Sequence, residues 1–250
     1  MLVPRAPSGI PGLDAIIQGG FPTNSTIALR SEPSNHTEYF EQQFVMEGLK
    51  QGRSAVYCCL TRPAASVIRS MKHQGFDVLE HVANDQLVFL DCYSMHKEMA
   101  VLGVDQAVQK KIISVTQMDD ERLLQDGLAT AVERIRDLKG MRAVCESVPG
   151  TLTGGSAVEI MRWGRKAFGE LRAYEVLALH TFPIGVREEM FDVMAHDFDA
   201  ILEIRADRGQ ERVRYHLSIQ KMRLTDFPPK MHELDTEGMM LSLKTVQKIV

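Results

Sequence analysis

Residues 25–52 of the chain read STIALRSEPSNHTEYFEQQFVMEGLKQG. The mostly apolar and β-branched run Ser25–Leu29 favours a strand. From Glu38 to Gly52, Phe40 and Phe44 are among the apolar residues that recur at the spacing of one helix face. A polar segment that contains a proline separates the two. This stretch therefore predicts a strand, a loop and a helix in that order.

The same alternation continues along most of the chain. Short apolar runs typical of buried strands alternate with longer segments of helical periodicity. Further strands are expected at Ala55–Leu60, Leu87–Cys92, Arg142–Ser147 and Val176–Thr181, and helices at about Pro63–Gln74, Asp120–Lys139 and Ala157–Ala173. Strands separated by helices predict a mainly parallel sheet with helices on both faces.

The C-terminal part of the chain has a different pattern. Phe198–Arg205 and Val213–Lys221 are expected to be adjacent antiparallel strands, and Met239–Leu243 a last strand after a glycine. The predicted fold class is therefore α/β, with antiparallel edge strands at the C-terminus. In such a sheet the ligand crevice lies at the carboxyl ends of the central strands.

Length and composition limit the protein class. The chain has 250 residues, of which 44% are hydrophobic and 25% charged, with a formal net charge of −4. One core can serve a chain of this length, so we expect a single domain over residues 1–250, with a possible insertion around 94–120 where the pattern is irregular. No apolar run approaches the roughly 20 residues that cross a bilayer, and we expect a cytoplasmic protein without a membrane partner. The mild acidity also argues against nucleic acid as a partner.

The chain has four cysteines, and all of them lie in or beside predicted strands: Cys58, Cys59, Cys92 and Cys145. None forms a C-x-x-C pair, and neighbouring residues on a strand point to opposite faces. We expect buried structural thiols rather than a metal site or a disulfide framework. Met190 and Met194, at helical spacing, are expected to fill a core.

The segment before the first long strand carries a resemblance to a known family. Ser8-Gly-Ile-Pro-Gly-Leu-Asp14, followed by Gly19-Gly-Phe-Pro22, resembles the entry segment of RecA-superfamily ATPases of the KaiC and RadA type. Later pieces arrive in the family's order: Gln43 and Phe44 resemble its P-loop helix, Leu128–Ser147 its helix and Walker B strand, and Ile219–Arg223 its basic strand end. The resemblance covers most of the chain and implies a RecA-like, P-loop NTPase type of fold.

The phosphate-binding positions depart from the family pattern. A P-loop, G-x-x-x-x-G-K-[ST], wraps backbone N–H groups around phosphate, neutralises it with lysine and binds magnesium through a hydroxyl. The aligned residues here are Ser31, Glu32, Pro33, Ser34, Asn35, His36, Thr37 and Glu38. Ser31 and His36 replace the glycines, Thr37 the lysine and Glu38 the hydroxyl, so we expect a degenerate Walker A segment.

The catalytic positions implied by the resemblance have changed as well. The family places paired glutamates at the end of the strand after the P-loop helix, where this chain has Thr61 and Arg62. Glu146 and Ser147 stand at the Walker B position. Lys221 and Arg223 match the basic strand end that faces a neighbouring subunit's nucleotide in the family, and are candidates for contacts across an interface.

The candidate nucleotide-contacting residues are therefore those of the degenerate P-loop, the Walker B position and the interface pair: Ser31, Ser34, Asn35, His36, Thr37, Glu38, Glu146, Ser147, Lys221 and Arg223. No catalytic residue and no resident metal is expected. Loss of a charged lysine contact removes about 1.5–3 kcal/mol, and a carboxylate about 8 Å from a phosphate charge adds about 2 kcal/mol of repulsion at an effective dielectric constant of about 20. A micromolar ATP site would fall to around millimolar.

The leading hypothesis is a catalytically inactive RecA/KaiC-like protein, a pseudo-ATPase with a regulatory or scaffolding role through oligomer or partner interfaces. The expected partners are other copies of the chain or an active RecA/KaiC-like paralogue, and no cofactor is expected. One alternative is an ATP-binding or slowly hydrolysing ATPase with a rebuilt nucleotide site, where ATP and magnesium bind weakly. A second is a recombinase-like accessory protein that binds DNA. Asp91, Glu146 and His180 also follow strands, and a metal-dependent or acid/base site there is weighed against a polar crevice without chemistry.

Overall fold

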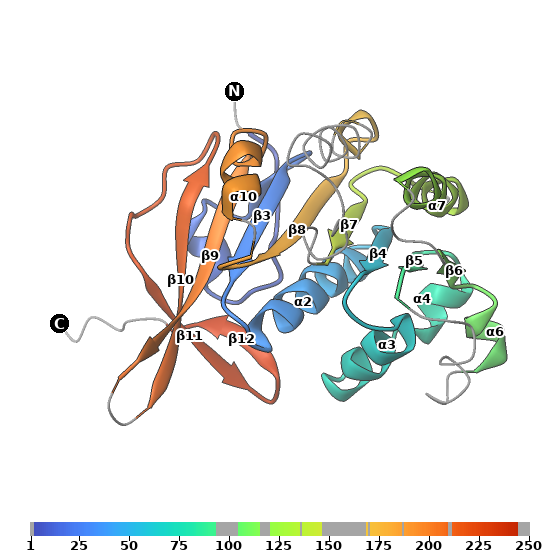
Figure 1. The fold of residues 1–250 in the computed structure, drawn as a ribbon, viewed down its shortest axis with the longest axis horizontal. Coiled ribbons are helices and arrows are strands. Elements are labelled where there is room, and N and C mark those ends of the chain that lie inside the picture. Colours follow the sequence, from blue (N-terminus) through green and yellow to red (C-terminus); the bar gives the residue numbers. More distant parts are fainter. Residues whose placement is uncertain are drawn as a thin grey trace.

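The structure is a computed structural model that describes residues 3–93, 105–115, 121–135, 137–146, 169, 171–186, 188–209 and 212–244. Within these residues, ten strands form one sheet in the order β12-β11-β10-β9-β3-β8-β7-β4-β5-β6, and β1 and β2 form a separate pair (Figure 1). The strands are β1 (Arg5–Ala6), β2 (Phe21–Pro22), β3 (Thr26–Ser31), β4 (Ala55–Cys59), β5 (Leu87–Asp91), β6 (Ile113–Ser114), β7 (Arg142–Cys145), β8 (Leu177–Pro183), β9 (Ala200–Arg208), β10 (Val213–Met222), β11 (His232–Glu237) and β12 (Met240–Leu243). The helices are α1 (Leu13–Ile16), α2 (His36–Lys50), α3 (Ala64–His73), α4 (Leu79–Ala83), α6 (Gln106–Gln109), α7 (Glu121–Arg134) and α10 (Glu188–Met194).

The sheet is parallel in its central part and antiparallel at one end. The strands from β9 through β3, β8, β7, β4 and β5 to β6 run parallel. Antiparallel pairing joins β9 to β10, β10 to β11 and β11 to β12. The carboxyl ends of β3, β8, β7 and β4 therefore meet at one edge of the sheet, where parallel α/β sheets bind ligands.

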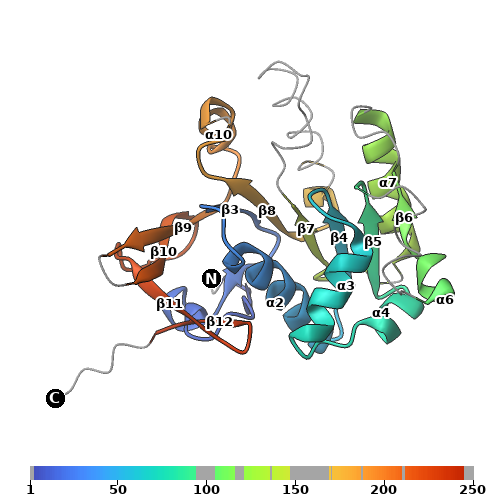
Figure 2. The ribbon, with the colours of Figure 1, turned by 60° about the horizontal axis from the view of Figure 1, so that its bottom comes forward.

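Helices cover both faces of the sheet (Figure 2). One hydrophobic cluster includes Phe40 and Phe44 of α2 and Val67 of α3. The cluster on the other face includes Ala131 of α7 and Phe191 of α10. Strand residues alternate between these clusters, because successive side chains of a strand point to opposite faces.

A buried arginine of the sheet packs against helix α2. Arg142 of β7 is 1% exposed and donates hydrogen bonds of 2.7 Å to the carbonyls of Phe44 and Pro7. Its guanidinium carbon lies 4.7 Å from the centre of the Phe44 ring. Gly48 makes this packing possible, since a Cβ there would stand 2.6 Å from Cδ of Arg142.

The structure confirms the predicted fold class and most of the predicted strands. It adds short elements that were not predicted, among them β1, β2, α1 and α4, and it differs in three further respects. The polar β11 was not predicted, α7 ends at Arg134 rather than near Lys139, and β6, within the suspected insertion, joins the main sheet beside β5. Residues 94–104 and 116–120 of that segment, Ser147 and most of the helix expected over 157–173 lie outside the described residues. The number of domains stays a prediction.

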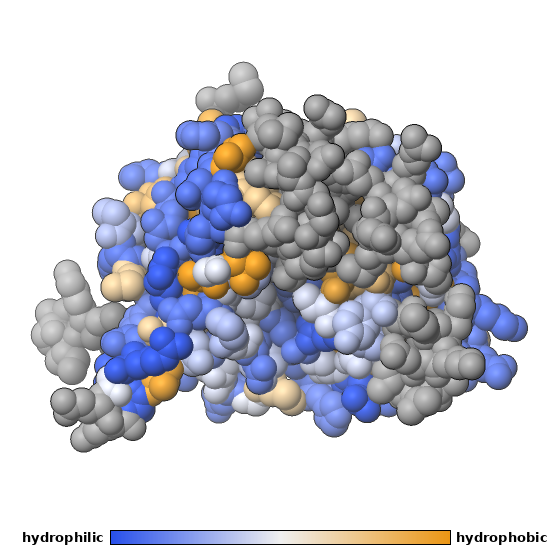
Figure 3. All heavy atoms as spheres, viewed as in Figure 1, coloured by the Kyte–Doolittle hydropathy of each residue, from blue (hydrophilic) through white to orange (hydrophobic). Residues whose placement is uncertain are grey.

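No described helix combines the length and apolarity that a membrane span requires. On the face shown in Figure 3, hydrophilic residues cover most of the coloured surface and hydrophobic residues form small patches among them.

Candidate functional site

The carboxyl ends of β3, β4, β7 and β8 surround a cavity of about 210 Å³. The loop after β3 and the first turns of α2 form one wall, and the residues that follow β4 and β7 form another. Its lining includes four acidic side chains and one basic side chain: Glu32, Glu38, Glu41, Glu146 and Arg62. The other lining residues are Ser31, Pro33, Ser34, Thr37, Thr61, Thr181, Phe182 and Pro183.

Most of the sequence-predicted P-loop residues line this cavity, as the order of elements requires. Ser31, Ser34, Thr37 and Glu38 lie on it, whereas Asn35 and His36 line a second hollow on the other side of the loop, beside Tyr215. The ring of His36 lies 4.0 Å from that of Tyr215, and burial lowers the pKa of His36. At neutral pH His36 is therefore uncharged, so it does not replace the missing lysine charge.

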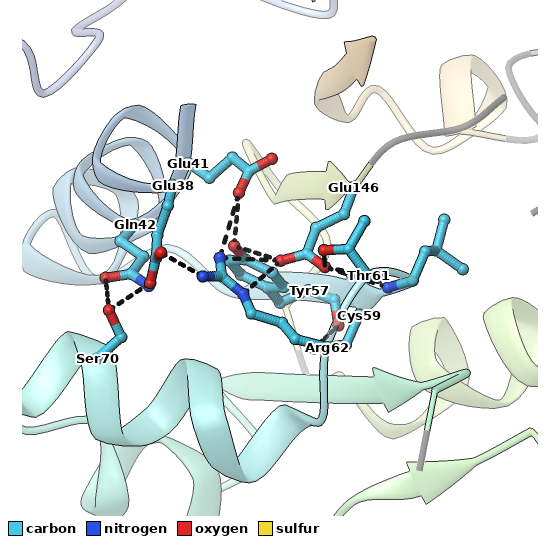
Figure 4. Close-up of polar contacts among 10 residues, drawn as sticks. Glu38, Glu41, Gln42, Tyr57, Cys59, Thr61, Arg62, Ser70 and Glu146 are labelled. Atoms are coloured by element: carbon cyan, nitrogen blue, oxygen red, sulfur yellow. Dashed lines mark hydrogen bonds and ion pairs between the residues drawn. The ribbon is translucent and has the colours of Figure 1, made fainter. Parts of the chain in front are cut away.

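Arg62 is the centre of the polar network in the cavity (Figure 4). Its guanidinium forms an ion pair with Glu38 on the first turn of α2. On the other side it contacts Glu146, with Nη2 at 3.1 Å and Nε at 3.3 Å from the same carboxylate oxygen. The Glu41 carboxylate lies 3.7 Å from Nη2. One arginine thus connects the position aligned with the magnesium-binding hydroxyl to the Walker B position.

Glu146 is held by backbone and side-chain donors in addition to Arg62. Its second carboxylate oxygen accepts hydrogen bonds from the amides of Leu60 and Thr61, both at 3.2 Å, and from Oγ1 of Thr61 at 2.8 Å. The side chain is 2% exposed. Charge-assisted hydrogen bonds of this kind are stronger than those between neutral groups, and here they fix the carboxylate against the end of β4.

Glu41 and Tyr57 complete the network behind Arg62. The hydroxyl of Tyr57 lies 2.9 Å from a Glu41 oxygen and 3.2 Å from Glu146, and its one proton can be donated to only one of them at a time. Burial, followed by repulsion from Glu146, raises the pKa of Glu41 to about 8, although Arg62 opposes this shift. At neutral pH Glu41 is mainly protonated. Glu38, Glu146 and Arg62 then leave the network with one net negative charge.

The outer surface of the α2 turn is also paired. Oε1 of Glu38 accepts hydrogen bonds from Gln42, at 2.9 Å, and from the hydroxyl of Ser70 on α3, while Oε2 forms the ion pair with Arg62. At the cavity rim, Glu32 pairs with Arg208 of β9 at 3.0 Å. The acidic side chains of this wall are therefore paired with the protein's own cations and hydrogen-bond donors.

Lys221 and Arg223 lie elsewhere. Asp199 precedes β9 and bonds to the amino end of β3, so these basic residues lie at the end of β3 opposite the cavity. Lys221 donates to the carbonyls of Ala195 and His196, and Arg223 pairs with Asp199 at 3.0 Å. Within the chain they do not join the cavity residues, and their contact with a neighbouring subunit stays a prediction.

The structure does not place Asp91, Glu146 and His180, the residues of the possible acid/base site, on one face of the sheet. Asp91 accepts hydrogen bonds from the amides of Ala64 and Tyr93, and lies with Glu146 on the α2–α3 side of the sheet. His180 packs near Phe198 on the other side, and burial lowers its pKa to about 3. No group of three potential metal ligands occurs among the residues that the structure describes.

The sequence reasoning missed Glu41 and Tyr57 and did not place Arg62 at the centre of an ion-pair network. A signal was available for Glu41, because it stands one helical turn after Glu38 on α2. Tyr57 gave none, since a tyrosine in an apolar strand is typical of a core.

Comparisons with known proteins agree with this architecture. The sheet order and the helices on both faces define the RecA-type fold class, and a solved KaiC-like protein from Pyrococcus horikoshii has the same fold, with a TM-score of 0.77 at 20% identity over 98% of this chain and 100% of that one. The family model for the KaiC ATPase matches residues 6–242, and the chain belongs to this family.

Curated relatives are similar over nearly the whole chain. A UPF0273 protein from Pyrobaculum aerophilum is 29% identical over 94% of this chain and 80% of its own length. One from Aeropyrum pernix is 27% identical over 99% of this chain and 97% of its own.

Proposed function

We propose that this KaiC-type protein is a pseudo-ATPase, which keeps the family's fold but does not hydrolyse ATP, and that it acts as a regulator or scaffold. The observation that carries the proposal is the double engagement of Arg62 with Glu38 and Glu146. Because one guanidinium holds both side chains, the protein's own cation takes the place that magnesium and phosphate would need.

The charges of the cavity support weak binding of nucleotide. A phosphate group that enters meets a network with net negative charge and no lysine at position 37. Each close carboxylate contributes about 2 kcal/mol of repulsion at about 8 Å and an effective dielectric constant of about 20. To reverse this field, Arg62 would have to leave Glu146, and the loss of one partner of a buried ion pair typically costs about 3–5 kcal/mol.

Among the residues that the structure describes, each carboxylate that lines the cavity already has a partner in the protein. Of its buried carboxylates, Glu146 accepts hydrogen bonds from Leu60, Thr61 and Arg62, and Glu41 is mainly protonated at neutral pH. A general base must be deprotonated and within reach of the water it activates. The proposal therefore predicts loss of hydrolysis as well as weak binding.

A phosphate-release assay with excess magnesium and ATP tests this proposal. The expected turnover is indistinguishable from that of a Glu146→Gln variant purified in parallel, because any common residual rate comes from a contaminant. Turnover that falls in Glu146→Gln but not in the surface control Arg205→Ala would contradict the proposal and favour the alternative of a rebuilt ATPase site.

The regulatory role rests on interfaces, and its partners are proposed to be further copies of this chain or an active KaiC-type paralogue. Sedimentation or light scattering gives the self-association, and mixing with the paralogue gives the change in its assembly and its hydrolysis rate. If the protein is a monomer and changes neither the assembly nor the hydrolysis rate of the paralogue, the regulatory role is wrong. The proposed absence of hydrolysis would be unaffected by that result. Nucleic acid is not among the proposed partners, and salt-sensitive retention of DNA would reverse that.

A further inference from the structure

Two cysteines that are far apart in the sequence are neighbours in the sheet. Cys58 of β4 and Cys145 of β7 are register partners on adjacent parallel strands. Both belong to the side of the sheet that packs against α7 and α10, and the nearby Cys145 thiol raises the pKa of Cys58. Cys59, the next residue, belongs to the cluster on the opposite face.

The backbone spacing at this pair suits a disulfide that is strained. Neighbouring strands lie about 4.7–4.9 Å apart, inside the range of about 4.4–6.8 Å between Cα atoms of bridged cysteines. Parallel side-chain directions keep the Cβ atoms at a similar distance, slightly beyond the usual 3.5–4.5 Å. Cys145 is the last residue of β7, where the strand can adjust. Strained disulfides are more easily reduced and are typical of regulatory rather than structural bonds.

The two thiols differ in their access to solvent. Cys58 is 6% exposed, whereas Cys145 is only partly buried. The nearby Cys145 thiol and burial raise the pKa of Cys58 well above its usual value. Cys145 is therefore the first target of an oxidant, and Cys58 the residue that resolves the product.

We propose that Cys58 and Cys145 form a reversible disulfide when the protein meets a peroxide, and that this bond is a redox-sensitive modification site. The Cys145 sulfur attacks one oxygen of hydrogen peroxide, the O–O bond breaks, and one water leaves as Cys145 becomes a sulfenic acid. The Cys58 sulfur then attacks the Cys145 sulfur, and the hydroxyl group leaves with the Cys58 proton as a second water. The two thiols are oxidised by two electrons and the peroxide is reduced by two.

The bond would clamp the two strands that carry the polar network. Thr61 and Arg62 follow β4, and Glu146 follows Cys145 directly, so the disulfide would lie on the reverse side of the sheet from the Arg62–Glu146 contact. It would close the long loop between residues 58 and 145, and disulfides that close long loops stabilise mainly by restricting the unfolded chain. We expect the thermal midpoint of the oxidised protein to rise by roughly 5–15 °C.

Native, full-length protein treated with a small excess of hydrogen peroxide tests the proposal. We expect a mass loss of about 2 Da, from two hydrogens, and a Cys58–Cys145 linkage in the peptide map without reductant. Dithiothreitol should restore both the mass and the thermal midpoint. Cys59→Ala is the matched control, as it removes an adjacent buried thiol on the other face and should leave the linkage intact, while Cys145→Ala should abolish it.

Several results would overturn the proposal. They are oxidation of Cys145 to a sulfinic acid without a linkage, a linkage to Cys92 instead of Cys58, and a linkage that appears only in denaturant. The peptide map of the wild-type protein decides between these results even if a variant fails to fold.

Discussion

Replacement of Arg62 by alanine is the most informative perturbation of the cavity. Its side chain is 24% exposed and contacts Glu38, Glu41 and Glu146, whose side chains are 21%, 4% and 2% exposed. Removal of one partner of a fully buried pair costs about 3–5 kcal/mol. Glu146 keeps its hydrogen bonds from Leu60 and Thr61, and the guanidinium is partly solvated, so we expect a loss near the lower limit, about 3 kcal/mol.

The loss is measured by urea or thermal unfolding at neutral pH. About 3 kcal/mol corresponds to a fall of roughly 6–12 °C in the thermal midpoint of a chain of this size. The matched control is Arg205→Ala: Arg205 is 51% exposed and its partner Glu203 keeps an ion pair with Arg30, so we expect a loss of about 0–1 kcal/mol. Arg62→Lys should be intermediate, since lysine keeps the charge but loses the forked geometry.

An Arg62→Ala cost equal to that of Arg205→Ala would show that Arg62 does not neutralise this network.

Two further variants test the protonation of Glu41 and the packing around Arg142. The folded pKa of Glu41, about 8, lies above its ordinary value of 4.5, so the proton on Glu41 stabilises the fold fully below about pH 4.5, and this contribution is lost as the pH rises through 8. The denaturant midpoint of Glu41→Gln should therefore rise relative to wild type between about pH 5 and 9, and parallel curves would contradict the raised pKa. Gly48→Ala should cost about 1–3 kcal/mol in urea unfolding, because the added methyl would displace the buried Arg142, whereas the exposed Gln51→Ala should be nearly neutral; the usual gain from Gly→Ala in a helix would show that the arginine moves freely.

Much of the fold followed from local patterns in the sequence. The apolar strands and the long helix α2 have strong periodicity, and the segment from Ser8 to Pro22 carried the family resemblance, which the KaiC family match confirms. Met190 and Met194 are buried, as their helical spacing predicted. The strand β11 escaped prediction because Leu234 is its one buried residue, so its position depends on pairing with β10 and β12 rather than on its own composition.

The cavity was predictable in position but not in chemistry. The order of strands placed Glu38, Arg62 and Glu146 at one edge of the sheet. The sequence did not show which carboxylates Arg62 would bind, because β4 and β7 become neighbours only through a crossover. The same crossover explains why Cys58 and Cys145, expected to be separate buried thiols, turned out to be partners in register.

Isothermal titration of the protein with ATP, with and without magnesium and at protein concentrations that detect millimolar affinity, shows whether Arg62 keeps the nucleotide out of the cavity. We expect no heat at micromolar ATP, at most millimolar binding, and no gain in affinity from magnesium. Micromolar binding that requires magnesium and is lost in Glu146→Gln would contradict this expectation, since it would mean that Arg62 yields the cavity to the nucleotide.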